Sequence, residues 1–328
     1  MKECTLVVMA AGMGSRFGGL KQITPVDEEK NFIIDYSVYD AKKAGFTKVV
    51  FVIKEENLNL FESTIGSRLK KQIKVEYAFQ RPEDIPSDFD IKKREKPWGT
   101  VQAILCTKPY VDGPFAVINA DDFYGFDALK KAHEFLMKNT SPYTYASIAY
   151  PLGSTMSENG SVKRGVLFLE NNLVKTIIES NIEQKDGELI ATPLDGRKPL
   201  KVQKEDPVSM NMFAFQHDIY RLLEEYFTNF FKMPEEDLIK KEALLPDCLE
   251  ENLGNNKITI LCEKTTSQWL GMTYISDLEI VKKELEQLKE KGVYPQKLWE
   301  WFHGRNKTKN GRTSKHFRRS KLQLLCAR

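Results

Sequence analysis

The stretch LVVMAAGMGSRFGGLKQ, residues 6–22, decides the fold of this 328-residue chain. A short apolar run leads directly into a glycine-rich turn, as expected of a buried parallel strand that ends beside a ligand. The turn carries Arg16, and Lys21 follows it closely. Backbone N–H groups of a glycine turn bind phosphate oxygens, and the two cations supply the charge that a polyphosphate needs. The stretch therefore predicts a phosphate-binding loop after the first strand.

The residues that follow alternate between strand and helix patterns. Buried strands are predicted over residues 48–53, 74–79 and 114–120, and helices over 32–43 and 126–137. Residues 98–105 are predicted as a loop that enters a short helix. Strands that alternate with helices indicate βαβ units and a mostly parallel sheet, with ligands bound outside the carboxyl ends of the strands. The sequence therefore predicts an α/β, Rossmann-like, doubly wound core over about residues 1–140.

The second half of the chain has a different pattern. Strands are predicted over residues 143–150, 166–170, 174–179 and 208–215, and helices over 218–231 and 276–292. The pair Asn171-Asn172 stands between two of these strands and predicts a hairpin. Residues 82–97 form a polar segment bounded by prolines, which we interpret as a mobile flap near the site. We expect an antiparallel subdomain over about 141–275, followed by a helical segment over 276–302.

Composition narrows the class of protein. A 41% hydrophobic and 11% aromatic composition is normal for a soluble globular protein, and no apolar run approaches the roughly 20 residues of a membrane span. The five cysteines are scattered without a CxxC pair, which argues against a disulfide framework or structural zinc site and suits a cytoplasmic location. Residues 303–328 carry nine Lys or Arg and no acid. We predict a disordered basic tail there and no nucleic-acid partner.

Glycines at 12, 14 and 18 also permit a dinucleotide-binding interpretation. That fingerprint requires an acid at the end of the second strand, about 20 residues after the glycines. The second predicted strand here ends at residue 53, some forty residues after Gly12. The spacing therefore counts against a nicotinamide-dependent oxidoreductase.

Residues 6–22 resemble the signature loop of the sugar-1-phosphate nucleotidyltransferases, the nucleotide-sugar pyrophosphorylases. Further segments resemble that family's motifs in the same order: 97–104 (PWGTVQAI), 117–125 (VINADDFYG), 163–166 with 178–179, 208–213, and 269–274. The resemblance covers roughly residues 4–285. It implies a GT-A-like nucleotidyltransferase fold, with one catalytic domain over residues 1–275.

The resemblance implies transfer of a nucleoside monophosphate from a nucleoside triphosphate (NTP) to a phosphorylated acceptor, with Mg²⁺ as cofactor. It assigns catalysis to Arg16, Lys21 and Asp121, and the metal to Asp121, with Asp122 as the alternative. The residues implied in nucleotide binding are Ala10, Ala11, Gly12, Gly14, Ser15, Arg16, Lys21, Gln80, Gly99 and Thr100. Those implied in acceptor binding are Gly165, Glu179 and Asn211.

Two positions depart from the family pattern. Gly271 stands where the family commonly has a second metal-binding aspartate, and Asp277 is the nearby candidate ligand. Ser180 stands where the sugar enzymes usually have a lysine that holds the acceptor's phosphate, so Lys201 or Lys204 would have to substitute. These departures also permit a non-catalytic, nucleotide-binding regulatory protein on the same fold.

The close spacing of Arg16 and Lys21, with Gln22 next, resembles the cytidylyltransferases of small phosphorylated alcohols, which share this fold. CTP with an alcohol phosphate such as phosphocholine therefore competes with UTP, dTTP or GTP and a sugar 1-phosphate. The nucleobase, the acceptor and the oligomeric state stay open at this point.

Overall fold

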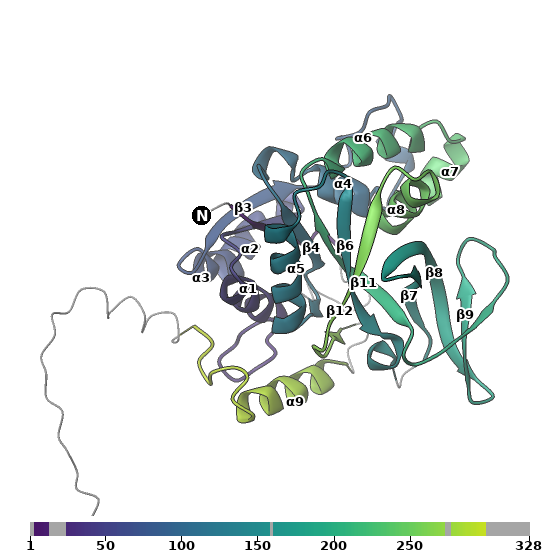
Figure 1. Ribbon diagram of the computed structural model, residues 1–328. Helices are drawn as coiled ribbons and strands as arrows, with labels where there is room; N and C mark the ends of the chain where they lie inside the picture. Colours follow the sequence, from purple (N-terminus) through teal and green to yellow (C-terminus); the bar gives the residue numbers. More distant parts are fainter. Residues whose placement is uncertain (1–2, 13–23, 158–159, 273–276, 300–328) are drawn as a thin grey trace, which may run out of the picture.

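The computed structural model describes residues 3–12, 24–157, 160–272 and 277–299 (Figure 1). In these residues one mixed sheet of eleven strands runs in the order β10-β9-β8-β12-β6-β11-β4-β1-β2-β3, and β7 pairs with both β11 and β8. A second, two-stranded sheet is formed by β13 and β5. The α/β fold class expected from the sequence is confirmed.

The first half of the chain builds the parallel part of the sheet. It consists of β1 (Thr5–Met9), β2 (Lys48–Ile53), β3 (Lys74–Phe79) and β4 (Phe115–Asn119), paired in the order β4-β1-β2-β3. Successive side chains of a strand point to opposite faces of the sheet. Leu6 and Val8 accordingly pack into one apolar core, and Val7 packs into the core on the other face. Burial on both faces explains why β1, β2 and β4 are almost continuously apolar, whereas the edge strand β3 carries Lys74 and Glu76.

Helices cover both faces of the sheet. One face carries α1 (Ile33–Ala44), α5 (Phe126–Lys138) and a short run made of α2 (Leu58–Phe61), η4 (Glu62–Gly66) and α3 (Ser67–Leu69). The other face carries α4 (Thr100–Leu105), α6 (Ile219–Phe230), α7 (Glu235–Lys240) and α8 (Leu245–Gly254). Figure 1 shows α1 beside α5, with α4, α6 and α8 gathered elsewhere. Short 3₁₀ turns are η3 (Glu55–Asn57), η5 (Ile91–Lys93), η6 (Lys108–Tyr110) and η7 (Leu152–Thr155).

The second half of the chain adds the mainly antiparallel part. Its strands are β6 (Thr144–Pro151), β7 (Val162–Glu170), β8 (Leu173–Lys185), β9 (Glu188–Pro193), β10 (Leu200–Val202), β11 (Pro207–Phe215) and β12 (Thr259–Lys264). The predicted β7–β8 hairpin is present, and its strands are longer than predicted. Asn171 and Asn172 both have positive φ, 49° and 65°. Two such residues are typical of the type I′ turn, whose twist matches the flanking strands.

The helix α9 (Asp277–Glu290) packs across the N-terminal half of the chain. Val281 and Leu285 share an apolar cluster with Tyr36 of α1. Beside that cluster, Lys289 Nζ lies 2.9 Å from Asp27 Oδ2, and both side chains are only 2% exposed. The predicted apolar face of this helix is confirmed. The predicted tail over 303–328 lies outside the described residues, and among the described helices none is long and apolar enough to cross a membrane.

Candidate active site

The carboxyl ends of the parallel strands meet at one edge of the sheet. The chain builds β1, β2 and β3 outward in one direction and then places β4 on the other side of β1. This change of direction makes a topological switch point between β1 and β4, which is where open α/β sheets bind ligands. Ala120 N, after β4, donates to Met9 O of β1 at 3.1 Å. The segments that follow both strands therefore start side by side.

The predicted phosphate loop begins at this switch point. Ala10 and Ala11 follow β1 and are buried, and Ala10 N donates to Val52 O of β2 at 2.8 Å. Gly12 is exposed, and a Cβ added there would meet nothing within 4 Å. Gly14, Ser15, Arg16 and Lys21 lie outside the described residues, so their roles stay predictions.

The two aspartates after β4 have different environments. Asp121 is half-buried in a turn, whereas Asp122 is buried in the short strand β5 (Asp122–Phe123). Asp122 Oδ2 accepts from Asn119 Nδ2 at 2.9 Å, and the hydroxyl oxygen of Tyr124 lies 3.3 Å from it. Burial, and then the charge of Asp121, raise the pKa of Asp122 to about 7. Asp122 is thus held within the protein, and Asp121 is the more accessible carboxylate.

The strand β13 (Leu270–Gly271) lies against this acidic pair. It pairs antiparallel with β5, and Gly271 stands opposite Asp122. A Cβ added at Gly271 would lie 2.3 Å from Trp269 Cη2 and 3.0 Å from Asp122 Oδ1. The indole of Trp269 therefore occupies the space that an aspartate side chain would need. Neither two-residue strand was predicted, because two residues carry no periodicity.

Arg164 is a buried cation that lies beside Trp269, and the sequence did not predict a role for it. Its guanidinium lies 4.7 Å from the ring centroid of Trp269 and donates to Thr155 Oγ1 at 3.2 Å. Burial lowers the pKa of Arg164 to about 10. The positive charge of Arg164 in turn offsets part of the rise that burial causes in the pKa values of Asp122 and Glu179. The sequence could have indicated Arg164, because it lies directly before Gly165 in the segment 163–166 that resembles a family motif.

The register of the β7–β8 hairpin places Arg164 opposite Ser180. A cation therefore stands across the strands from the position where the family pattern has lysine. Ser180 itself is fully buried, and its Oγ donates to Ile178 O at 3.2 Å. The two lysines considered as substitutes are exposed, and Lys201 forms an ion pair with Glu188 between β10 and β9.

The structure brings together the residues predicted to bind the acceptor. Gly165 pairs with Glu179 on β8 and with Ser209 on β11. A Cβ at Gly165 would lie 2.6 Å from Glu179 Oε1, so a larger residue would displace this carboxylate. Burial, and then the charge of Asp247, raise the pKa of Glu179 to about 7. A carboxyl group at this pKa exists in both protonation states near neutral pH.

Asn211 lies where β11 bulges between Ser209 and Phe213. Its φ is 58°, a left-handed conformation that asparagine tolerates better than most residues. The Tyr124 hydroxyl donates to Met210 O at 2.8 Å and so ties the bulge to the segment that holds Asp122. Bulges of this kind re-aim side chains beside active sites.

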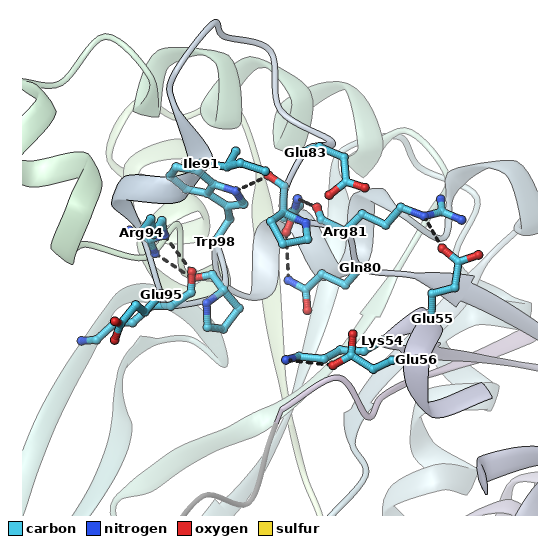
Figure 2. Close-up of a pocket in the computed structure, with 14 residues that line it drawn as sticks. Lys54, Glu55, Glu56, Gln80, Arg81, Glu83, Ile91, Arg94, Glu95 and Trp98 are labelled. Carbon is cyan, nitrogen blue, oxygen red and sulfur yellow. Dashed lines mark hydrogen bonds and ion pairs between the residues drawn. The ribbon is translucent and has the colours of Figure 1, made fainter. Parts of the chain in front are cut away.

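A cavity of about 270 Å³ lies at the carboxyl ends of β2 and β3 (Figure 2). Trp98 Nε1 donates to Pro82 O at 2.7 Å, and the Arg94 guanidinium lies 4.3 Å from the Trp98 ring centroid. This hydrogen bond therefore joins the two ends of the predicted flap, residues 82–97. The residues that line the cavity are Lys54, Glu55, Glu56, Gln80, Arg81, Pro82, Glu83, Ile91, Arg94, Glu95, Lys96, Pro97, Trp98 and Gln102.

Three of the residues predicted to bind the nucleotide, Gln80 after β3 and Gly99 and Thr100 at the start of α4, lie at or beside this cavity. Gln80 Nε2 donates to Gly99 O at 3.1 Å. Gly99 has a φ of 105°, and a Cβ there would lie 2.5 Å from Ala243 O, so this position requires glycine. Thr100 Oγ1 accepts from Leu245 N at 2.7 Å and thereby anchors the start of α8.

Comparisons with known proteins agree with this architecture. A sequence model of the family described as "Nucleotidyl transferase" matches residues 5–237. No curated protein matches the chain by sequence. The inositol-1-phosphate CTP transferase of T. maritima has a TM-score of 0.59 and 14% identity, covering 87% of this chain and 96% of its own.

Two further solved structures are similar. A glucose-1-phosphate thymidylyltransferase from Bacillus anthracis, described as putative, has a TM-score of 0.57 and 15% identity, covering 86% of this chain and 94% of its own. A UDP-glucose pyrophosphorylase complexed with UDP-glucose has a TM-score of 0.56 and 16% identity, covering 87% of this chain and 99% of its own. The resemblance found in the sequence is confirmed. The chain belongs to the nucleotidyl transferase family and is a nucleotidyltransferase of the GT-A-like fold.

Proposed function

We propose that this nucleotidyltransferase joins a nucleoside monophosphate to a sugar 1-phosphate or a related alcohol phosphate. A phosphate oxygen of the acceptor attacks the α-phosphorus of the NTP and forms a new P–O bond. The bond from the α-phosphorus to the α–β bridging oxygen breaks, and pyrophosphate leaves with the electron pair. The switch point supports this proposal, because the segment that enters the predicted phosphate loop follows β1 there and the Asp121-Asp122 pair follows β4, which pairs with β1 and with β11.

The loop residues supply charge in this proposal. Arg16 would bind the β- and γ-phosphates and the leaving pyrophosphate, while Lys21 would neutralise charge on the α-phosphate. Displacements of this type depend on positioning and on charge stabilisation more than on covalent help.

Asp121 would hold Mg²⁺, which supplies charge neutralisation for the departing pyrophosphate. The donor set fits, because Mg²⁺ typically takes one or two carboxylates and completes its shell with waters and substrate phosphates. The described residues contain no group of three or more potential ligand side chains, as a cation held mainly by the protein would need. Asp277 begins α9, and its role as a ligand stays a prediction.

The acceptor would bind over β7, β8 and β11. Glu179 and Asn211 would contact its hydroxyl groups, and Gly165 would leave room for them. We assign the cation for the acceptor's phosphate to Arg164 in place of Lys201 or Lys204. Its position opposite Ser180 supports this assignment.

A non-catalytic nucleotide-binding role is the competing proposal. One observation favours it: the indole of Trp269 fills the space at Gly271 where the family commonly has a second metal-binding aspartate. This role requires NTP binding without Mg²⁺-dependent turnover.

The deciding experiment measures pyrophosphate release with Mg²⁺ for each common NTP against sugar 1-phosphates, inositol phosphates and phosphocholine. Release that depends on one acceptor supports the transferase and identifies both substrates. Asp121→Asn should abolish this release, whereas Asp186→Asn, in the exposed turn between β8 and β9, is the matched control. Tight NTP binding with no release from any pair would favour the regulatory role.

A further inference from the structure

The carboxylate of Asp27 is the centre of a buried hydrogen-bond group that joins α9 to the N-terminal half of the chain. Its Oδ1 accepts from Asn31 N at 2.8 Å, and its Oδ2 accepts from Asn31 Nδ2 at 2.8 Å. Oδ2 also accepts from the Tyr36 hydroxyl at 2.7 Å and from Lys289 Nζ at 2.9 Å. Burial alone would raise the pKa of Asp27, but these hydrogen bonds hold it below its usual value. The carboxylate is therefore ionised and only accepts, so the Tyr36 hydroxyl donates to it and its ring has a fixed direction.

The ring of Tyr36 packs against Phe123 of the strand β5. The two ring centroids lie 6.3 Å apart with the planes at 77°, an edge-to-face arrangement that aromatic pairs prefer. Tyr294 packs edge-to-face against both rings, at 5.1 Å from Tyr36 and 6.1 Å from Phe123. The Tyr294 hydroxyl donates to Asp40 Oδ2 at 2.6 Å, and Asp40 is fully buried. Each tyrosine is thus anchored at its hydroxyl by a buried carboxylate, and each presents its ring to Phe123.

The strand β5 lies between these aromatic rings and the carboxylate of Asp122. Successive side chains of a strand point to opposite faces, so Phe123 and Asp122 point away from each other. Phe123 and its cross-strand partner Leu270 belong to the apolar cluster that contains both tyrosines. On α1, Ser37 Oγ donates to Asp122 O at 3.4 Å. The backbone that carries Asp122 is therefore held from the side of α1 and α9.

We infer that Lys289 is a positioning residue for the Asp121-Asp122 pair. It acts through Asp27, Tyr36 and Phe123, which together fix the backbone of β5 behind that pair. This inference rests on the proposed function, in which the pair supplies the Mg²⁺ ligand. Groups that orient metal ligands change metal affinity when they are altered, although they do not touch the metal. The part of the chain that matches the family model ends before α9, so this helix gains a role that family membership alone does not assign.

A second buried lysine provides the matched control. Lys48 Nζ lies 2.5 Å from Glu3 Oε1, and the Lys48 side chain is 2% exposed, as is that of Lys289. Lys48 begins β2 and so lies at the amino end of the strand, whereas the candidate site lies at the carboxyl ends. Lys48→Met and Lys289→Met both remove the cation of an ion pair whose lysine is buried, so both should lower the free energy of unfolding. Only Lys289→Met should also affect β5.

The first measurement is hydrogen exchange of the backbone amides of residues 119–125 in the free, full-length protein. We expect Lys289→Met to speed this exchange roughly 2–30-fold more than Lys48→Met does, the range seen when one member of a packed network is altered. Tyr36→Phe keeps the ring and the ion pair and removes only the hydroxyl, so it should speed the same exchange by a smaller factor. Equal exchange over 119–125 in the two lysine variants would overturn the inference. If Lys289→Met does not fold, Tyr36→Phe decides, and unchanged exchange in that variant would overturn it too.

The second measurement is the gain in NTP affinity that Mg²⁺ produces, taken from calorimetric titrations in Mg²⁺ and in EDTA. An acidic pair that is less well fixed binds the metal more weakly, so Lys289→Met should reduce this gain at least about twofold. NTP affinity in EDTA should stay unchanged, because the proposed NTP contacts lie elsewhere. Lys48→Met should keep the full gain. A gain that is unchanged in Lys289→Met, or reduced equally in both variants, would contradict the role of Lys289.

The two measurements separate this inference from the proposed function. If Mg²⁺ adds nothing to NTP affinity in the unaltered protein and no substrate pair releases pyrophosphate, the transferase proposal fails, and exchange over 119–125 still decides the role of Lys289. If pyrophosphate is released and Lys289→Met behaves like Lys48→Met in both measurements, the inference fails and the transferase proposal stands.

Discussion

Replacing Gly271 by alanine should destabilise the protein, although the change adds only one methyl group. The new Cβ would lie 2.3 Å from Trp269 Cη2 and 2.4 Å from Cζ2. Trp269 is buried and lies under the guanidinium of Arg164, so its ring has little room to move. Overpacking of this kind typically costs about 1–3 kcal/mol of the free energy of unfolding.

The assay is thermal or urea denaturation of a double-mutant cycle. For a chain of this size each kcal/mol corresponds to about 2 °C in melting temperature, so Gly271→Ala should lower it by about 2–6 °C. In a Trp269→Leu background the ring atoms are absent, and the same alanine should cost little. The expected coupling between the two positions is therefore about 1–3 kcal/mol.

Gly254→Ala is the control for the added methyl group. Gly254 is the last residue of α8, and a Cβ there would meet nothing within 4 Å. This variant should keep or slightly raise stability, because alanine favours helix over glycine. Additive costs at Gly271 and Trp269, or no cost at Gly271, would refute the argument that the indole excludes an acid from this position.

Other expectations concern charge and proton binding. Lys21→Ala should lower pyrophosphate release with the fold intact, and unchanged turnover would refute its assigned role. Tyr124→Phe removes the hydroxyl next to Asp122, so it should lower turnover at unchanged NTP affinity, checked by comparing kcat with the NTP dissociation constant. Burial raises the pKa of Asp40 to about 7 from 3.8, so the folded state retains a proton that the unfolded state has lost between these pH values. Stability should therefore fall as pH rises through that window, by up to about 1.4 kcal/mol per pH unit. Asp40→Asn, which can still accept from Tyr294, should make this fall shallower in urea denaturation curves measured from pH 4 to 8, and the raised pKa values of Asp122 and Glu179 should maintain the rest of it.

The strands and helices could be predicted because the buried residues of each element recur in the sequence with a regular spacing. The boundaries of β2 and β3 match the predicted ranges, because β2 is an apolar run and β3 alternates polar with apolar residues over its first half. The Asn171-Asn172 turn could also be predicted, because left-handed residues in a tight hairpin favour asparagine. In each case the signal is local in sequence.

The parts that could not be predicted depend on contacts between distant residues. Arg164 meets Trp269 across more than a hundred residues, and neither position carries a local pattern that indicates the other. The buried amide of Gln102 donates from Nε2 to Arg81 O and Asp84 O, and these backbone carbonyls belong to a loop whose conformation has no periodic signature. The resemblance implied nucleotide binding for Gln80, but nothing local in the sequence indicates that its Nε2 donates to Gly99 O.

The buried pair of Asp27 and Lys289 joins positions 262 residues apart. A ribosome that adds about 5–20 residues per second needs roughly 13–50 seconds to make the intervening chain. The strands of the parallel core can pair during that time. The segment around Asp27 lacks its ion-pair partner until Lys289 has been synthesised. We therefore expect nascent chains arrested before α9 to be cut by proteases in this segment, and full-length chains to be protected there. The order of synthesis thus makes the segment that follows the predicted phosphate loop one of the last parts of the enzyme that we expect to become ordered.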